Sequence, residues 1–258
     1  MRKKILAVMV GLTVILGGCS KQSAQNTESK QSIENIESIL QEVKKETKEL
    51  KSGKSNMVHF LKYDKIATSN ALGYDVSGDE KFEPLEYALK GKYMSNVYGE
   101  KKYESYLKDG VYYIKMDDFW YKKKRPTDKS DAYNFKDQSI NMRDDILNLL
   151  DNKDNWDISK DGDKVTFKLK KTEEFKNLVI KEHLKKFLKE EKFSEFEYTV
   201  EYVYNTKNKK LDKLFYEIVT VTDSPSVRAT TRGTLEEINK EVNIEIPEEA
   251  KKALEKKA

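Results

Sequence analysis

The sequence has almost no cysteine and very little histidine, and both absences limit its chemistry. Among 258 residues there is one cysteine, Cys19, and there are two histidines, His59 and His183. A single cysteine leaves no disulfide to form within the chain. Neither histidine has Cys, His, Asp or Glu at a recognised ligand spacing, so we expect no metal site and no nucleophile here. Each histidine instead shares an expected apolar face with its neighbours.

Motifs of the common enzyme classes are missing as well. The sequence contains no GxSxG, HExxH, Walker or GxGxxG pattern. Its acidic pairs, such as Asp117-Asp118 and Asp144-Asp145, are adjacent, and adjacent side chains diverge on a strand or a helix. They are therefore poor acid/base pairs, and we expect neither an enzyme nor a cofactor.

The chain also lacks a large excess of charge of either sign. The chain has 49 basic and 45 acidic residues, and three of the basic ones, Arg2, Lys3 and Lys4, stand at its start. The rest is almost balanced, so basicity alone points to no partner. Fifteen Tyr, ten Phe and two Trp supply area to bury, which indicates a folded domain rather than a disordered chain.

The first eighteen residues have the layout of a secretory signal. Three positive residues precede the apolar run Ile5 to Leu16, which is shorter than the ~20 residues that a membrane-spanning helix needs. Leu16-Gly17-Gly18-Cys19 follows and resembles the lipobox of bacterial lipoproteins. An ordinary signal peptide ending near a cysteine is the alternative, and release of a signalling peptide from Ile5 to Gly18 is a further hypothesis.

The lipobox resemblance implies lipidation of Cys19 and cleavage in front of it. Two or more acyl chains on one residue are enough for stable anchoring in a membrane, whereas a single chain is not. We therefore expect residues 1–18 to be a signal peptide, and the mature chain to be a membrane-anchored extracytoplasmic monomer. This expected location outside the cytoplasm excludes nucleic acid as a partner. The polar residues 19–31 predict a disordered tether.

The segment Ser32 to Leu50 predicts an amphipathic helix with Ser32 as its N-cap. It has no Trp or Phe anchor for a membrane surface, so packing on a sheet is favoured over lying on the bilayer. Ile66 to Glu83 is rich in Gly, Asn and Asp and predicts a loop. Helices are also predicted over Asp137 to Asp151, from Thr172 to Leu188, and after Pro247.

Asp109-Gly110 is a two-residue hairpin signal that fixes the register of the strands beside it. It pairs Leu107 with Tyr112 and Tyr103 with Met116, so these side chains share one apolar face. Asp117-Asp118 predicts the next turn. Met57 to Tyr63 is apolar on both faces apart from Lys62 and predicts a strand. Further strands are predicted in these segments: Leu85 to Tyr93, Trp156 to Ile158, Val165 to Leu169, Phe196 to Tyr204, Leu211 to Thr222, Val227 to Leu235 and Val242 to Ile246.

Because all these turns are short, we expect an antiparallel sheet with helices gathered on one face, an α+β fold. No linker interrupts residues 32–258, which predicts a single domain. Asp157-x-Ser159-x-Asp161-Gly162 partly matches the start of a calcium loop, but Lys168 stands at the twelfth position, where a Glu is required. A hairpin turn is the better interpretation of these residues.

Two short segments resemble a known family. Gly110-Val-Tyr-Tyr-Ile-Lys115 with Trp120-Tyr-Lys122, and the closing stretch Asn239 to Ala250, are similar to lipoproteins with the lipoprotein-localisation-factor fold, including mycobacterial lipid-carrier lipoproteins. The resemblance implies a strongly curved antiparallel half-barrel, with helices on or over its concave face and an apolar cavity between them. The family shares no catalytic residues, so none is carried over.

Three hypotheses of function follow. The first is a non-enzymatic binding protein for a lipid or another apolar ligand, in a cavity of at least about 300 Å³. The residues expected to line that cavity, unless they simply fill a core, are Leu89, Tyr93, Leu107, Tyr112, Ile114, Phe167, Tyr198 and Tyr202. The second is a surface module for a protein or an anionic wall polymer, which would use Trp120, Lys122, Lys123, Lys124 and Arg125 unless these only protect a sheet edge. The third, a hydrolase, has no identifiable site.

Overall fold

The computed structural model describes residues 24–63, 71–125, 134–185, 192–223 and 226–255, with the backbone alone at 24–35. Residues from Glu37 onward form one compact unit, and Met1–Ile36 form a second one. The expected signal peptide and Cys19 lie outside the described residues. Among the residues described, no helix is both long and apolar enough to cross a membrane.

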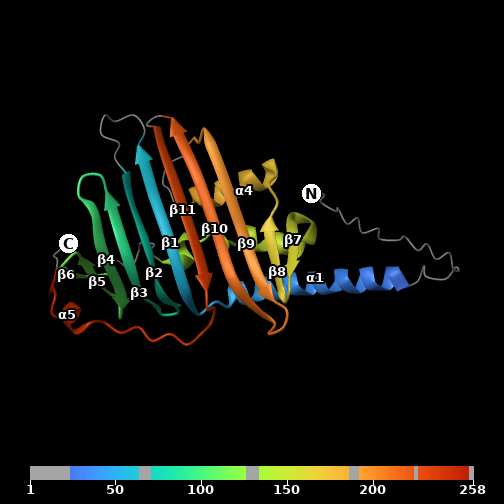
Figure 1. The fold of residues 1–258 in the computed structure, drawn as a ribbon, viewed down its shortest axis with the longest axis horizontal. Helices are drawn as coiled ribbons and strands as arrows, with labels where there is room; N and C mark the ends of the chain where they lie inside the picture. Colours follow the sequence, from blue (N-terminus) through green and yellow to red (C-terminus); the bar gives the residue numbers. More distant parts are fainter. Residues whose placement is uncertain (1–23, 64–70, 126–133, 186–191, 224–225, 256–258) are drawn as a thin grey trace, which may run out of the picture. The chain divides into compact units, whose positions relative to one another are not determined.

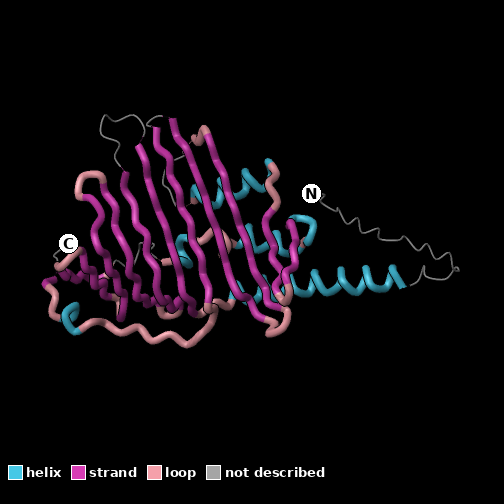
Figure 2. The backbone as a smooth tube through the Cα atoms, in the orientation of Figure 1, coloured by secondary structure: helices cyan, strands magenta, loops and turns pink. Residues whose placement is uncertain are grey.

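The larger unit is built on one open sheet of twelve strands (Figures 1 and 2). Their spatial order is β12-β6-β5-β4-β3-β2-β1-β11-β10-β9-β8-β7, and every described pairing is antiparallel except that of β12 with β6. The strands are β1 (Ser52–Tyr63), β2 (Ala71–Phe82), β3 (Leu85–Ser95), β4 (Gly99–Lys108), β5 (Val111–Met116), β6 (Phe119–Lys124), β7 (Trp156–Asp161), β8 (Lys164–Leu169), β9 (Glu195–Asn205), β10 (Lys210–Asp223), β11 (Ser226–Glu236) and β12 (Leu254–Glu255).

The helices are few and mostly short. They are α1 (Ala24–Lys48), α2 (Phe135–Gln138), α3 (Asp144–Leu147), α4 (Glu173–Leu184) and α5 (Glu248–Lys251), with 3₁₀ turns η1 (Asn148–Asp151) and η2 (Lys153–Asn155). The segment that contains α2 and α3 packs on one face of the sheet, where Phe135 meets the ring of Tyr216 and the Tyr202 hydroxyl donates to the Asn141 carbonyl. We call this face the helix side; α4 lies against it, behind the strands in Figure 1.

The hairpin prediction at Asp109-Gly110 is confirmed. Leu107 pairs with Tyr112, Ser105 with Ile114 and Tyr103 with Met116. Both turn residues have positive φ, 51° for Asp109 and 72° for Gly110, as a primed turn requires. The turns at Asp117-Asp118 and Gly162 are confirmed too, so Asp157 to Asp161 form a hairpin strand and not a calcium loop.

The loop predicted from Ile66 to Glu83 is wrong for its described part, because Ala71–Phe82 is strand β2. Its glycines fit a sheet for a reason the composition does not reveal. A Cβ on Gly78 would overlap the carbonyl oxygen of Ala88 on β3, and one on Gly91 would overlap that of Asp75 on β2. The two strands therefore approach each other more closely than side chains would allow, which is where glycine is tolerated inside a sheet.

Three other boundaries also differ from the sequence predictions. Helix α1 begins at Ala24 and not at Ser32, because the Gln, Glu and Lys residues before Ser32 favour a helix; this shortens the expected tether. The helix predicted over Asp137 to Asp151 is broken into α2, α3 and η1. The strand predicted from Val242 to Ile246 is an irregular segment in which Ile244 is buried, so its alternation reflects burial without strand pairing.

The core lies on the helix side. Alternate residues of the long strands point there, including Tyr202 and Val200 on β9, Leu214 and Tyr216 on β10, and Met57 on β1, and all five are buried. The opposite face, which we call the outer face, is mostly charged and polar along the same strands. The main core of the larger unit is therefore shared by the helix side of the sheet and the helical segments that pack on it.

Candidate ligand-binding cavity

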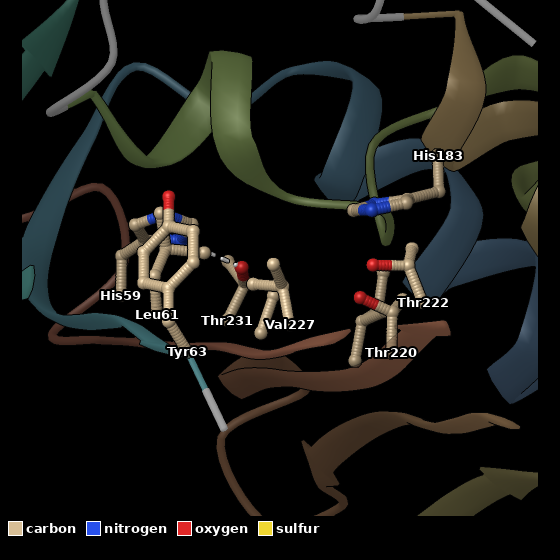
Figure 3. A pocket seen from close by; sticks show the side chains of 10 residues that line it. His59, Leu61, Tyr63, His183, Thr220, Thr222, Val227 and Thr231 are labelled. Carbon is tan, nitrogen blue, oxygen red and sulfur yellow. Dashed lines mark hydrogen bonds between the residues drawn. The ribbon is translucent and has the colours of Figure 1, made fainter. Parts of the chain in front are cut away.

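A cavity of about 310 Å³ lies on the helix side, at the ends of three neighbouring strands (Figure 3). It is bounded by alternate residues of β1, β11 and β10 and by one residue of α4. The lining residues are His59, Leu61, Tyr63, His183, Ile218, Thr220, Thr222, Val227, Ala229 and Thr231. The cavity exceeds the lower size limit set by the first hypothesis.

The cavity exists because the inward side chains become smaller toward the ends of these strands. In the last filled row, Met57, Gly233 and Tyr216 lie side by side, and the Tyr216 ring covers the glycine. Two rows further on, the neighbours are Leu61, Ala229 and Thr220. Alanine and threonine cannot reach as far from the sheet as the tyrosine does, so space remains beneath α4.

The polar groups of the cavity lie on two sides of it. On the β1 side, the His59 Nδ1 and the Thr231 Oγ1 are 2.9 Å apart and hydrogen-bonded. On the β10 side, His183 points from α4 toward Thr220 and Thr222 (Figure 3). The rings of Phe193 and Phe196 lie 6.3 and 6.1 Å from the His183 ring and support its position. Between the two sides the wall is apolar.

None of the described lining residues is Asp, Glu, Lys or Arg. The described part of the chain also holds no group of three or more His, Cys, Asp or Glu side chains placed to bind a metal ion. The cavity offers hydroxyl groups, imidazoles and apolar surface, which suit binding by shape and hydrogen bonds.

The eight residues predicted to line a cavity lie elsewhere on the helix side. Leu89, Leu107, Phe167 and Tyr202 are completely buried, Ile114 and Tyr198 nearly so, and Tyr93 and Tyr112 are half-buried. Burial raises the pKa of Tyr202 far above its ordinary value, and its hydroxyl donates to the Asn141 carbonyl over 2.7 Å. These residues fill the core beside the cavity, and their role in binding stays a prediction.

Sequence reasoning missed the ten described lining residues because it searched for large apolar and aromatic side chains. Large side chains fill the space that they face, whereas a cavity forms where inward positions are small. The available signal was the run Ile218, Thr220, Thr222 on one strand with Val227, Ala229, Thr231 on the next. At these six inward positions there is no aromatic residue.

The predicted surface residues are divided between the two faces. Trp120 lies on the outer face, 5.8 Å from the Tyr106 ring, with the Lys115 ammonium 5.5 Å from its own ring centroid. Lys122 donates to the Lys251 carbonyl on the same face. Lys123 instead lies over Tyr112 on the helix side. Lys124 is exposed. The Arg125 backbone N–H donates to the Gly110 carbonyl and extends the pairing of β5 with β6.

A second, more open groove of about 870 Å³ lies between the outer face and the segment that follows β11. Lys108 fixes that segment by donating to the Ile244 carbonyl over 2.6 Å. Tyr106 and Tyr113 form part of the floor, and Lys90 is attracted to Tyr106. Hydrogen bonding to Tyr106 raises the pKa of Lys90 above its ordinary value, so this lysine remains charged.

The chain belongs to a family of unknown function, DUF6612, whose model matches residues 35–255. No curated protein matches it. Similar solved structures include LprF from Mycobacterium bovis, at 16% identity and a TM-score of 0.44 over 83% of this chain and 97% of that one. They also include the Mycobacterium tuberculosis lipoprotein LppX, at 15% identity and a TM-score of 0.38 over 82% and 98% of the two chains.

A third similar structure is a DUF1329 family protein from Desulfovibrio piger, at 8% identity and a TM-score of 0.26 over 81% of this chain and 94% of that one. The resemblance to mycobacterial lipoproteins suggested by the sequence is confirmed to the extent that LppX is among these structures. All three TM-scores are below 0.5, so the likenesses carry no inference about function.

Proposed function

We propose that this protein is a non-enzymatic, membrane-anchored extracytoplasmic lipoprotein that holds an apolar group in the cavity beneath α4. In this proposal Cys19 carries the lipid anchor, the sheet is a half-barrel, and its helix side is the concave face. The observation that carries it is the cavity itself, whose apolar wall is formed by Leu61, Ile218, Val227 and Ala229.

The size and position of the cavity support this function. Ligand pockets in proteins measure about 300 to 1,000 Å³ and are mostly apolar with a few polar groups. A cavity of about 310 Å³ with this lining is at the lower end of that range. Protein interiors rarely leave space of this size without a use, because unfilled volume costs packing energy.

The test fills the cavity and measures binding of an apolar fluorescent probe, N-phenyl-1-naphthylamine. Ala229→Trp places a large side chain in the cavity, whereas Thr230→Trp places the same side chain on the outer face one residue away. We expect saturable probe fluorescence with the unmodified protein and with Thr230→Trp, and its loss with Ala229→Trp. Absence of probe binding to the unmodified protein, or equal binding by Ala229→Trp, would overturn the proposal.

A second candidate function is recognition of an anionic polymer or a protein by the outer face. It is supported by the groove beside Tyr106 and Tyr113 and by the neighbouring Lys122 and Lys124. Reversal of charge at Lys122 and Lys124 to Glu would then abolish co-sedimentation with cell-wall polymer and leave probe binding in the cavity unchanged. Unchanged co-sedimentation would eliminate this candidate.

A further inference from the structure

We propose that the cavity takes a single-chain amphiphile whose uncharged, oxygen-bearing head group hydrogen-bonds to the Thr220 hydroxyl. This inference rests on the proposed function, since it concerns the same cavity, and it adds the class of ligand and the way it is oriented. It is carried by Thr220, by the neutral lining, and by the size of the space.

Thr220 is the polar lining residue whose hydroxyl is available to a ligand. It is only 6% exposed, and it lines the cavity on β10. Among the described residues its hydroxyl has no hydrogen-bond partner. Because Thr220 lines the cavity, a ligand oxygen placed beside its hydroxyl would gain a hydrogen bond there.

The surroundings of Thr220 provide further polar groups for the same head group. Its hydroxyl and that of Thr222 lie on the side of the cavity toward which His183 points (Figure 3). Each of these groups is able to donate or to accept a hydrogen bond. An alcohol or an ester oxygen placed here would find several partners within one small region.

The charge of the head group is limited by what the lining lacks. A cationic head group is normally stabilised by a carboxylate, and a phosphate by Lys or Arg. None of these side chains occurs among the described residues that line the cavity. Burial of an unpaired charge is strongly unfavourable, so the lining selects an uncharged head group.

The volume limits the apolar part of the ligand. About 310 Å³ is near the minimum for a small-molecule pocket, which favours one acyl chain over two or more. With the head group at Thr220, the chain would follow the apolar wall of Ala229, Val227 and Leu61 across β11 toward β1. The paired His59 and Thr231 would then lie beside the chain and not at the head group.

The experiment uses the protein with N-phenyl-1-naphthylamine bound and displaces this probe with ligands of equal chain length. The competitors are 1-decanol, decyltrimethylammonium and decyl phosphate. Four proteins are compared: the unmodified chain, Thr220→Val, Thr220→Ser, and Thr230→Val as the outer-face control. Thr220→Val keeps the shape and removes the hydroxyl, and Thr220→Ser keeps the hydroxyl.

We expect decanol to bind at least about 10-fold more tightly than either charged ligand. Thr220→Val should weaken decanol binding by about 2- to 10-fold, the range of one net hydrogen bond. Thr220→Ser and Thr230→Val should retain it. The affinity of the probe is measured separately for every variant, so that each displacement curve is converted into an affinity for decanol.

The outcomes separate this inference from the proposed function. Equal binding of decanol and a charged ligand would overturn the ligand class, and an unaffected Thr220→Val would overturn the placement of the head group. In both cases probe binding would still support the proposed function. If the probe does not bind, or binds equally to Ala229→Trp, the proposed function fails and this inference fails with it.

Discussion

Replacement of Asn141 by Leu should strongly destabilise the fold, because this buried amide joins the segment between α2 and α3 to the sheet. Its Nδ2 donates to the carbonyl oxygens of Glu201 and Phe215, over 3.0 and 3.2 Å. Its backbone N–H donates to the Ser139 hydroxyl oxygen. Its backbone carbonyl accepts a hydrogen bond from the Tyr202 hydroxyl. A leucine side chain is similar in size but has no hydrogen-bond donor.

The expected magnitude follows from the two carbonyl groups that lose their donor. Each buried polar group left unsatisfied costs about 1 to 3 kcal/mol, so the loss for two groups should be about 2 to 6 kcal/mol. For a domain of this size, 1 kcal/mol lowers Tm by about 2 to 4 °C, which predicts a shift of about 4 to 24 °C. Tyr202→Phe, which removes one hydrogen bond from the same region, should cost less.

Urea unfolding followed by tryptophan fluorescence measures this loss, since the ring of Trp156 lies 5.4 Å from that of Tyr202. The control is Asn56→Leu, at an exposed position on the outer face of β1, which should change stability by no more than about 0.5 kcal/mol. If Asn141→Leu is as stable as this control, the amide does not hold the segment on the sheet, and the account of the helix side is incorrect.

Three further outcomes are expected. Cys19→Ser should move the protein from the membrane fraction to the soluble fraction; continued membrane association would refute lipid anchoring at this residue. Gly233→Val should destabilise by about 1 to 3 kcal/mol, because its side chain would overlap the buried Tyr216 ring, whereas Thr234→Val on the outer face should not. Hydrogen bonds from Lys44 and Gln41 hold the pKa of Asp151 below its usual 3.8, so its ion pair stabilises the fold above that pH and is lost as pH falls through the lowered pKa. Asp151→Asn should therefore lower the free energy of unfolding by up to about 1 kcal/mol at pH 7 and leave it unchanged in strong acid. Urea unfolding at the two pH values measures this difference. An equal loss of stability at both pH values would contradict the linkage.

Local signals predicted much of the sheet. The turn chemistry of Asp109-Gly110 determines the register of β4 and β5 within a few residues, so no distant contact had to be known. Thr172 likewise caps α4 through its own side chain, which accepts from the Phe175 N–H. In both cases the cause lies within a short stretch of chain.

The errors arose where distant contacts decide the structure. The glycines of β2 and β3 are explained only by the approach of one strand to the other, and the composition alone favoured a loop. The cavity depends on the alignment of Ala229 with Leu61, more than 160 positions earlier in the chain. No pattern within β11 alone distinguishes a cavity wall from a sheet with small inward residues.

The position of β1 in the sheet has a consequence for the order of folding. This strand pairs with β2, which follows it directly, and with β11, which is completed only at Glu236. Until β11 is available, one edge of β1 has no hydrogen-bonding neighbour, and pairings between such distant segments form slowly. The sheet therefore cannot be completed until β11 has been made, which is compatible with the secretion that we propose for this protein.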